Sequence, residues 1–324
     1  MGRKYTARMH LKGHPGSMND IDRVGLIEAI ACQALWGFIC ILWRLLSSQS
    51  ALYLLAARMI WACVFMILLC VLAKKTRFLY LFRDRRACRF LLASAIITSV
   101  NWGVYIWAAN SGHLLETSIG YYLSPLITIA FGPLVFSERL TRMQKIACAL
   151  AAIGVASFIA IEGGSIWVSF ILAISFAAYG AVKKRGGYPA MPGMAVESIF
   201  NAAIGAAIFG IAAFFPGLWD LVPATPDAMA VTSPEAVSVL IALAGVLTAG
   251  PLLLYSAAAN RISMVANGFV QYVAPTIELA LAVTLFGETF TLGHGICLAF
   301  AWTGIAVLSV ELVSATRRAR QLYR

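Results

Sequence analysis

The apolar residues of this chain fall in repeated runs of about twenty, separated by short polar breaks. A helix of that length crosses a hydrocarbon core of about 30 Å, so each run predicts a membrane-spanning helix. The predicted helices cover residues 23–46, 51–73, 90–110, 114–136, 141–161, 165–182, 193–215, 236–259, 264–286 and 291–313. We therefore expect an all-α integral membrane protein with ten transmembrane helices.

The composition excludes a soluble fold. Of 324 residues, 61% are hydrophobic and only 12% are charged, whereas about a quarter of the residues in a soluble domain are charged. Residues 1–22 contain no short apolar core with a cleavage site, so we expect a disordered cytoplasmic tail there and not a removable signal peptide. Residues 314–324 are expected to form a second, basic cytoplasmic tail.

The basic residues predict the orientation of the helices. All of the 25 Lys and Arg residues except Arg44 and Arg58 lie in or beside the two tails and alternate breaks. The other breaks, near 47–50, 111–113, 162–164, 216–235 and 287–290, contain none. The positive-inside rule then places both termini in the cytoplasm. The net charge of +11 is thus a topology signal, and nucleic-acid binding, which needs a solvated basic face, is not expected.

The chain contains an internal repeat. Residues 118–156 match residues 268–306 at a constant offset of 150, and the matched pairs are Pro125 with Pro275, Phe136 with Phe286, Glu138 with Glu288, Thr141 with Thr291 and Gly154 with Gly304. The repeat predicts two five-helix halves, 23–162 and 163–313. Because five is odd, the halves must have opposite orientations. Inverted repeats are typical of transporters that work by alternating access, although channels and some membrane enzymes also contain repeats.

Ionisable residues within membrane helices are candidates for function because their burial is costly. Arg58 and Glu278 are predicted at similar depths from the outer side, so they could form a pair. Arg58 could bind an anionic solute group, or it could be structural. Glu197 lies near the cytoplasmic start of its helix and could couple transport to protons, as could Glu278. The alternative to proton coupling is a structural role for Glu197 at the membrane interface, where its carboxylate would complement the helix dipole.

Several polar and aromatic residues are candidates for lining a cavity. Asn267, Gln271, Pro275 and Glu278 follow the spacing of one helix face. Pro125 and Pro275 free backbone carbonyls within their helices, which suits a hinge or a cavity wall, while the alternative is a packing kink. Asn101 and Tyr105 share a face of the third helix, and Trp36 is similar, although aromatic residues are often only interfacial anchors. Glu138 and Glu288, at helix starts, are expected to be structural.

No feature of the sequence predicts catalysis. The seven cysteines show no metal-ligand spacing, and no nucleotide-binding, hydrolase or metalloprotease motif is present. We therefore expect no cofactor, no metal and no catalytic residue.

These motifs together resemble those of the RarD family of EamA-type proteins in the drug/metabolite transporter superfamily. The similarity extends over about residues 25–313, and its residues are Ala34-Leu35-Trp36-Gly37, Arg58-Met59-Ile60-Trp61, Asn101-Trp102, Ile106-Trp107-Ala108, Leu115 to Tyr122, Tyr179-Gly180, Gly193-Met194, Glu197, Gln271-Tyr272 and Pro275. The resemblance implies ten helices in two EamA repeats, a bacterial inner membrane, and export of a small metabolite or drug. Cys40, Arg44 and Glu278 depart from the pattern expected of that family.

The sequence thus favours a secondary transporter of a small-molecule solute in the lipid bilayer, with a cavity lined by its first four, seventh, eighth and ninth helices. Arg58 would attract an anionic group, and Asn101, Tyr105, Gln271, Tyr272 and Trp36 would orient the solute. A non-transporting sensor or assembly partner is the main alternative, and an enzyme acting on lipid-linked substrates is a weaker one. The sequence leaves a homodimer open.

Overall fold

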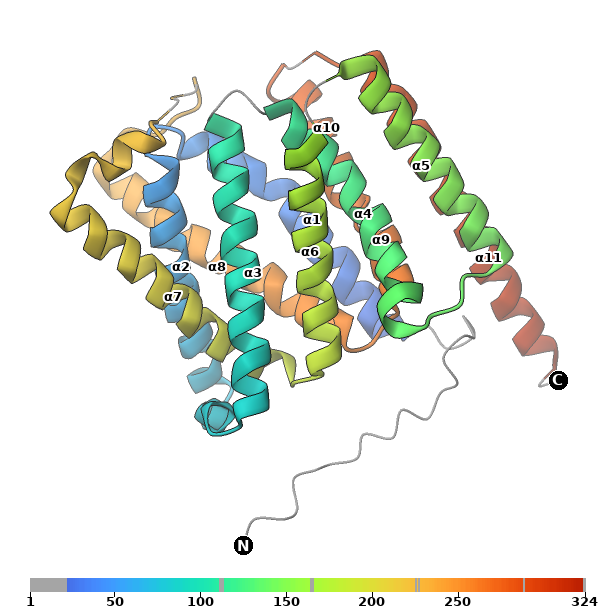
Figure 1. The fold of residues 1–324 in the computed structure, drawn as a ribbon, viewed down its shortest axis with the longest axis horizontal. Coiled ribbons are helices and arrows are strands. Elements are labelled where there is room, and N and C mark those ends of the chain that lie inside the picture. The colour runs from blue at the N-terminus through green and yellow to red at the C-terminus, as the bar shows by residue number, and fades with distance from the viewer. Residues whose placement is uncertain are drawn as a thin grey trace, which may run out of the picture.

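The computed structural model describes residues 22–110, 114–163, 166–224, 226, 228–287 and 289–322, and every regular element in them is helical. The long helices run side by side as a bundle (Figure 1). The elements are α1 (Arg23–Leu45), α2 (Ala51–Leu72), η2 (Thr76–Phe82), α3 (Arg85–Asn110), α4 (Leu114–Phe136), α5 (Arg142–Glu162), α6 (Ile166–Gly186), α7 (Ala190–Phe214), η3 (Pro216–Leu221), α8 (Pro234–Ala259), α9 (Met264–Val270), α10 (Val273–Thr284) and α11 (Leu292–Leu322).

The helix bounds agree closely with the predicted runs because polar capping residues stand at the breaks. The Asp22 carboxylate accepts hydrogen bonds from the backbone amides of Val24 and Gly25 at the start of α1. Thr141 and Gln144 form a reciprocal capping box at the start of α5. At the other end of the chain α11 continues through Leu322, so the tail predicted from residue 314 is largely helical. Residues 1–21, for which disorder is predicted, lie outside the described residues. So does Glu288, for which a structural role is predicted.

The helix predicted over 264–286 is wrong in one respect, because the chain is interrupted there. It forms α9 and α10, separated by a turn at Gln271 and Tyr272. Proline has no amide hydrogen, and its ring collides with the carbonyl four residues earlier, which for Pro275 belongs to Gln271. The break falls at that residue. Pro125, at the equivalent place in the first half, lies within a continuous α4.

The packing of the helices has the reciprocity that a two-fold axis between the halves produces. If α6 to α8 correspond to α1 to α3, α9–α10 to α4, and α11 to α5, then each contact between α-helices of the two halves has a counterpart. The contact of α1 with α8 corresponds to that of α6 with α3, and α1 with α10 corresponds to α6 with α4. The contacts α2 with α7, α4 with α9 and α5 with α11 are their own counterparts. Two repeats of five helices account for this arrangement.

Two glycines show the same reciprocity at the level of residues. A side chain added at Gly154 would meet Cys297, and one added at Gly304 would meet Ala147. Gly154 and Gly304 differ by the repeat offset of 150, and so do the residues that they meet, Ala147 and Cys297. Small residues at such positions let helices approach closely within a membrane. α5 and α11 lie side by side at the right of Figure 1.

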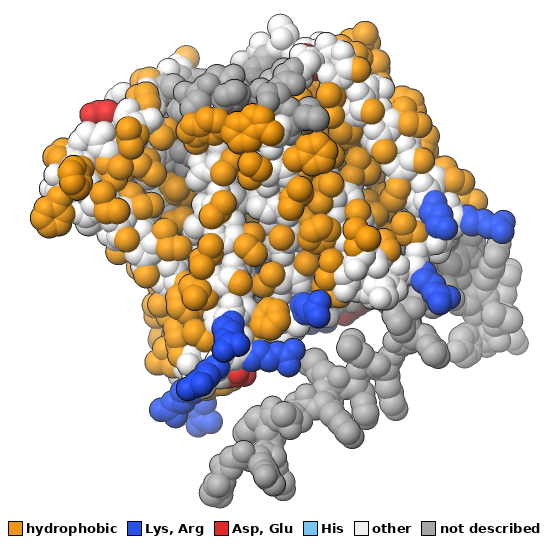
Figure 2. Space-filling view, in the orientation of Figure 1, with side chains coloured by type: hydrophobic (Ala, Val, Ile, Leu, Met, Phe, Trp, Pro, Cys, Tyr) orange, Lys and Arg blue, Asp and Glu red, His pale blue; other side chains and the backbone are white. Residues whose placement is uncertain are grey.

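The surface is that of a membrane protein. Within the described residues, eight helices are long and apolar enough to cross a bilayer: α1 to α8. The two further predicted spans are the interrupted α9–α10 and α11, whose apolar part is Leu292–Val307. Figure 2 shows hydrophobic side chains covering the visible face, with Lys and Arg side chains at one end. We call this the basic end; it contains the α2–α3, α4–α5, α6–α7 and α8–α9 connections.

The contact of α2 with α8 requires glycine at residue 245. A side chain there would meet the backbone nitrogen of Ala62 at 2.7 Å, and the backbone of Trp61 as well. We expect Gly245→Ala to destabilise the protein by about 1–3 kcal/mol, the usual cost of overpacking. Gly250→Ala in the same helix is the control, because no atom lies within 4 Å of its added side chain. The thermal unfolding midpoints of the two purified variants test this expectation, which fails if both behave alike.

Candidate functional site

Arg58 lies between two indole rings in the half of the bundle that is remote from the basic end. Its guanidinium carbon is 4.2 Å from the ring centre of Trp102 and 5.2 Å from that of Trp43. The buried Nε and Nη2 atoms have no hydrogen-bond partner. Cation–π contacts hold a guanidinium in place but do not satisfy its N–H groups. Arg58 therefore has unused donors within the bundle.

We infer that Arg58, Tyr105, Tyr121, Cys40 and Glu278, which lie near one another, line a common internal space, which we call the hollow. These residues come from α1, α2, α3, α4 and α10. They lie deep among the helices, yet each retains accessible surface, and Tyr121 is 39% exposed. Side chains that lie deep within a bundle and still have accessible surface line an internal space. The rings of Tyr105 and Tyr121 are 5.9 Å apart, and both side chains interact electrostatically with Arg58 and with Glu278.

The two charged groups of the hollow do not form the ion pair that their similar depth suggested. The only ion pairs found among the described carboxylates and basic side chains involve other residues, and the tyrosine pair interacts with both groups instead. Glu278 is half-buried and lies near Cys40 of α1. The hollow thus presents a cation and a carboxyl group that are separated by tyrosines.

An aromatic cluster separates this hollow from the basic end. Trp36 of α1 contacts Phe176 of α6 and Tyr255 of α8, with ring centres 5.5 and 5.9 Å apart. Tyr179 stacks on Tyr255 at 5.6 Å. Both tyrosines are almost completely buried. The cluster fills the middle of the bundle, so we regard Trp36 as part of a barrier and not as part of the hollow wall.

A buried ion pair lies beyond the aromatic cluster, toward the basic end. Lys183 Nζ is 2.7 Å from Glu197 Oε2, and the Ser94 hydroxyl donates to the same oxygen at 2.6 Å. Glu197 is 0% exposed, so its carboxylate is enclosed by protein and does not reach the surface. The helix predicted over 165–182 ends before Lys183, but α6 continues to Gly186 and includes Lys183, whose side chain is 5% exposed.

Two more groups of polar contacts join the halves at the basic end. The Glu138 carboxylate accepts hydrogen bonds from the backbone amides of Met264 and Val265, at 2.9 and 3.1 Å, and lies 3.7 Å from Lys184. Glu138 therefore caps α9, which belongs to the other half. This role is structural, as expected. The capped helix, however, is α9 and not α5, which follows Glu138 in the sequence. Near the surface, Arg261 bonds to Asp22 and Glu28.

The remaining predicted site residues have protein partners. The Asn101 amide donates to the Leu172 carbonyl and to Ser175, at 3.0 and 2.7 Å, and so ties α3 to α6. Gln271, at the helix break, accepts from Ser124 and Thr128, while its Nε2 has no partner. Tyr272 packs in an apolar cluster with Tyr122 and Phe158, and its hydroxyl is unpartnered. The structure does not bring these three into contact with Arg58.

Among the residues of the hollow and of the ion pair, sequence reasoning did not select Trp43, Cys40, Tyr121 or Lys183 as site candidates. The first three lie within apolar runs, where such side chains usually only pack. Lys183 had one usable signal, since it follows Tyr179 by four residues and therefore shares a helix face with a buried residue.

Comparison with known proteins identifies the family. The pattern of the EamA-like transporter family matches residues 23–160. An "Uncharacterized transporter" of Vibrio cholerae is 34% identical over 298 residues, which cover 92% of this chain and 95% of the relative. "Protein RarD" of Escherichia coli is 32% identical over 297 residues, covering 91% and 97%. The chain belongs to the EamA-like transporter family. It is thus a multi-pass membrane protein with RarD proteins among its relatives, and the resemblance inferred from its motifs is confirmed.

A crystal structure supports the fold of this EamA-like chain. It superimposes with a TM-score of 0.68 at 15% sequence identity, covering 90% of this chain and 98% of the other. At that identity the likeness concerns the fold alone.

The surface pair of Asp22 and Arg261 predicts a pH-dependent contribution to stability. Hydrogen bonds from Arg261 and from the Gly25 amide lower the pKa of the Asp22 carboxyl below its usual 3.8. A carboxyl with a lowered folded pKa stabilises the protein fully above its unfolded pKa, and this contribution is lost as the pH falls through the folded pKa.

We therefore expect the thermal midpoint of the wild type to exceed that of Asp22→Asn above about pH 5, with the difference closing below about pH 4. Asn retains the helix cap, so the variant isolates the charge. A difference that is unchanged at the acid end would show that the carboxylate charge is not responsible.

Proposed function

We propose that this chain is a secondary transporter that exports a small metabolite or drug across the bacterial inner membrane by alternating access, with both termini in the cytoplasm. The family supports membrane transport, and the charge asymmetry supports this orientation. In this proposal the basic end faces the cytoplasm. The hollow at Arg58 then lies on the outer side, and the ion pair of Lys183 with Glu197 closes the inner side.

The observation that carries this proposal is the incomplete bonding of Arg58. Leaving a buried donor without a partner costs about 1–3 kcal/mol, and more for a charged group. An anionic solute group in the hollow would accept from Nε and Nη2 and so remove that cost, through charge-assisted hydrogen bonds. Trp43 and Trp102 hold the guanidinium in position before the solute binds, which reduces the entropy lost on binding.

Other residues of the hollow complete the proposed site. The hydroxyls of Tyr105 and Tyr121 would bond to polar groups of the solute, and Glu278 would either take up a proton or attract a basic group. Gln271 and Pro275 mark the interruption between α9 and α10, where half-helices can tilt independently. We propose this interruption, with Pro125 opposite it in α4, as the hinge. Glu197 would be a second protonation site, at the closed end.

The experiment compares cells that lack the protein with cells that overproduce it, by untargeted profiling of small molecules inside and outside. We expect at least one anionic solute to move outward with expression, and this movement to fall on the order of tenfold or more in Arg58→Gln. Arg44→Gln is the matched control, because it removes the same charge at the same end of the bundle from a side chain that lies over the ring of Phe286 and not between Trp43 and Trp102. Equal transport by both variants, at equal protein levels, would remove Arg58 from the site.

A further inference from the structure

The ion pair at the basic end is incompletely satisfied. An ammonium group has three N–H donors, yet the acceptors found for Lys183 are Glu197 Oε2 at 2.7 Å and the weak acceptor Met194 Sδ at 3.1 Å. Glu197 Oε1 is buried and forms no hydrogen bond of normal geometry, although the Tyr179 hydroxyl lies close to this carboxylate. Both members of the pair therefore have unused hydrogen-bonding capacity, although both are almost fully buried.

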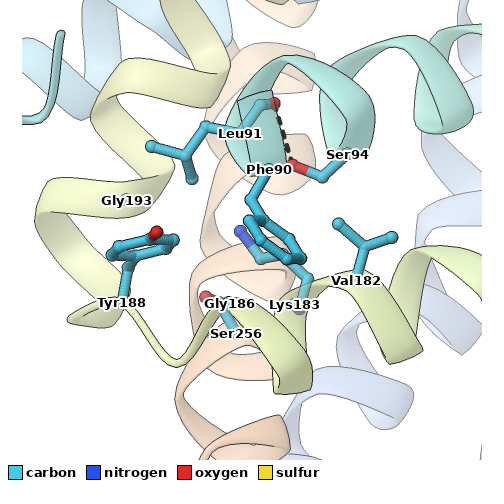
Figure 3. A pocket seen from close by; sticks show the side chains of 9 residues that line it. All are labelled: Phe90, Leu91, Ser94, Val182, Lys183, Gly186, Tyr188, Gly193 and Ser256. Carbon is cyan, nitrogen blue, oxygen red and sulfur yellow. Dashed lines mark hydrogen bonds between the residues drawn. The ribbon is translucent and has the colours of Figure 1, made fainter. Parts of the chain in front are cut away.

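A small pocket gives access to this pair. It is lined by residues of α3, α6, α7 and α8 and of the α6–α7 connection, among them Phe90, Ser94, Lys183, Tyr188 and Ser256. Figure 3 shows the Lys183 amine between Phe90 and Tyr188. The pocket volume is ≈ 10 Å³, which suits about one water molecule. The pocket is therefore too narrow for a solute while the ion pair is closed.

The inverted repeat relates this pair to the hollow. Arg58 is the seventh residue after the first residue of α2, and Glu197 is the seventh after the first residue of α7. Lys183 follows Tyr179 by four residues, as Cys40 follows Trp36 in the corresponding helix. Counted from the helix starts, the two halves thus place a charged group at the same depth, a guanidinium in α2 and a carboxylate in α7. At Arg58 the anionic partner is missing, whereas at Lys183 the protein supplies its own carboxylate.

We propose that Lys183 is a second anion-binding residue of the transport path and that Glu197 is its internal counter-anion, which the carboxylate or phosphate of an entering solute displaces. This inference rests on the proposed transport function and adds an entry site at the basic end. Exchanging one carboxylate for another leaves the buried charge compensated, whereas removing Glu197 without a replacement leaves Lys183 uncompensated. An anionic solute therefore opens this end at low cost, and a neutral one does not.

The first test measures access to the pocket. A reporter cysteine is placed at Ser256, which lines the pocket and is only 4% exposed, and its labelling by a hydrophilic maleimide is followed in purified protein. We expect Glu197→Gln to raise the labelling rate about tenfold or more, because the uncompensated Lys183 moves toward water. The double variant Lys183→Met with Glu197→Gln should label like the wild type, because it removes both charges together with side chains of similar size, so that no uncompensated charge draws water into the pocket. The protein without the reporter gives the background of the native cysteines.

The second test uses benzoate as the anion and benzamide as its neutral control. In the wild type with the reporter, benzoate should accelerate labelling because it competes with Glu197 for Lys183. In Glu197→Gln it should slow labelling, because it restores a counter-anion. Benzamide should have no effect, and neither compound should act on the double variant.

Several results would overturn the proposal: equal labelling of Glu197→Gln and the wild type, or an effect of benzoate that persists in the double variant or is shared by benzamide. The wild-type measurement remains decisive if Glu197→Gln does not fold. These tests measure pocket access and anion binding, not solute movement. The labelling results can therefore contradict this inference while solute movement still depends on Arg58. They can also support it where no solute is moved. The failure of this inference is thus distinguishable from the failure of the proposed function.

Discussion

A charge inside an apolar bundle is costly unless it is paired or faces water. This protein uses both solutions, one in each half of the repeat. Lys183 and Glu197 compensate one another in a closed, buried contact near the basic end, whereas Arg58 keeps free donors beside a hollow in the opposite half. The aromatic cluster around Tyr179 lies between them. The arrangement is therefore closed at one end and accessible within the other half, which is the asymmetry that alternating access requires.

Much of this fold could be predicted because its signals are local. The thickness of the bilayer sets the length of the helices. Capping residues such as Thr141 mark where helices begin. The offset of 150 between Pro125 and Pro275 indicates that the chain has two halves. Arg58 and Tyr105 could also be selected from the sequence, because a polar group deep within an apolar run must face protein or water. Glu278, which shares the hollow with them, could be selected for the same reason, whereas Cys40 and Tyr121 could not.

What could not be predicted depends on how helices rotate against one another. Lys183 looked like part of a loop because its run of basic residues continues to Arg185, yet α6 extends past it and buries it against α7. Glu138 caps a helix more than a hundred residues away, which no local pattern indicates. Proline alone did not decide the helix break, since Pro125 leaves α4 continuous.

The central claim is that the hollow communicates with the side opposite the basic end and is sealed from the basic end. Cys40 reports on it directly, since this native cysteine lies in the hollow near Glu278 and is partly accessible. The measurement is labelling by a membrane-impermeant maleimide added to one side at a time of vesicles of known orientation, with Cys40→Ser as the blank. The account predicts that labelling of Cys40 occurs from the side opposite the basic end only. Labelling that is faster from the basic side, or equal from both sides, would contradict it.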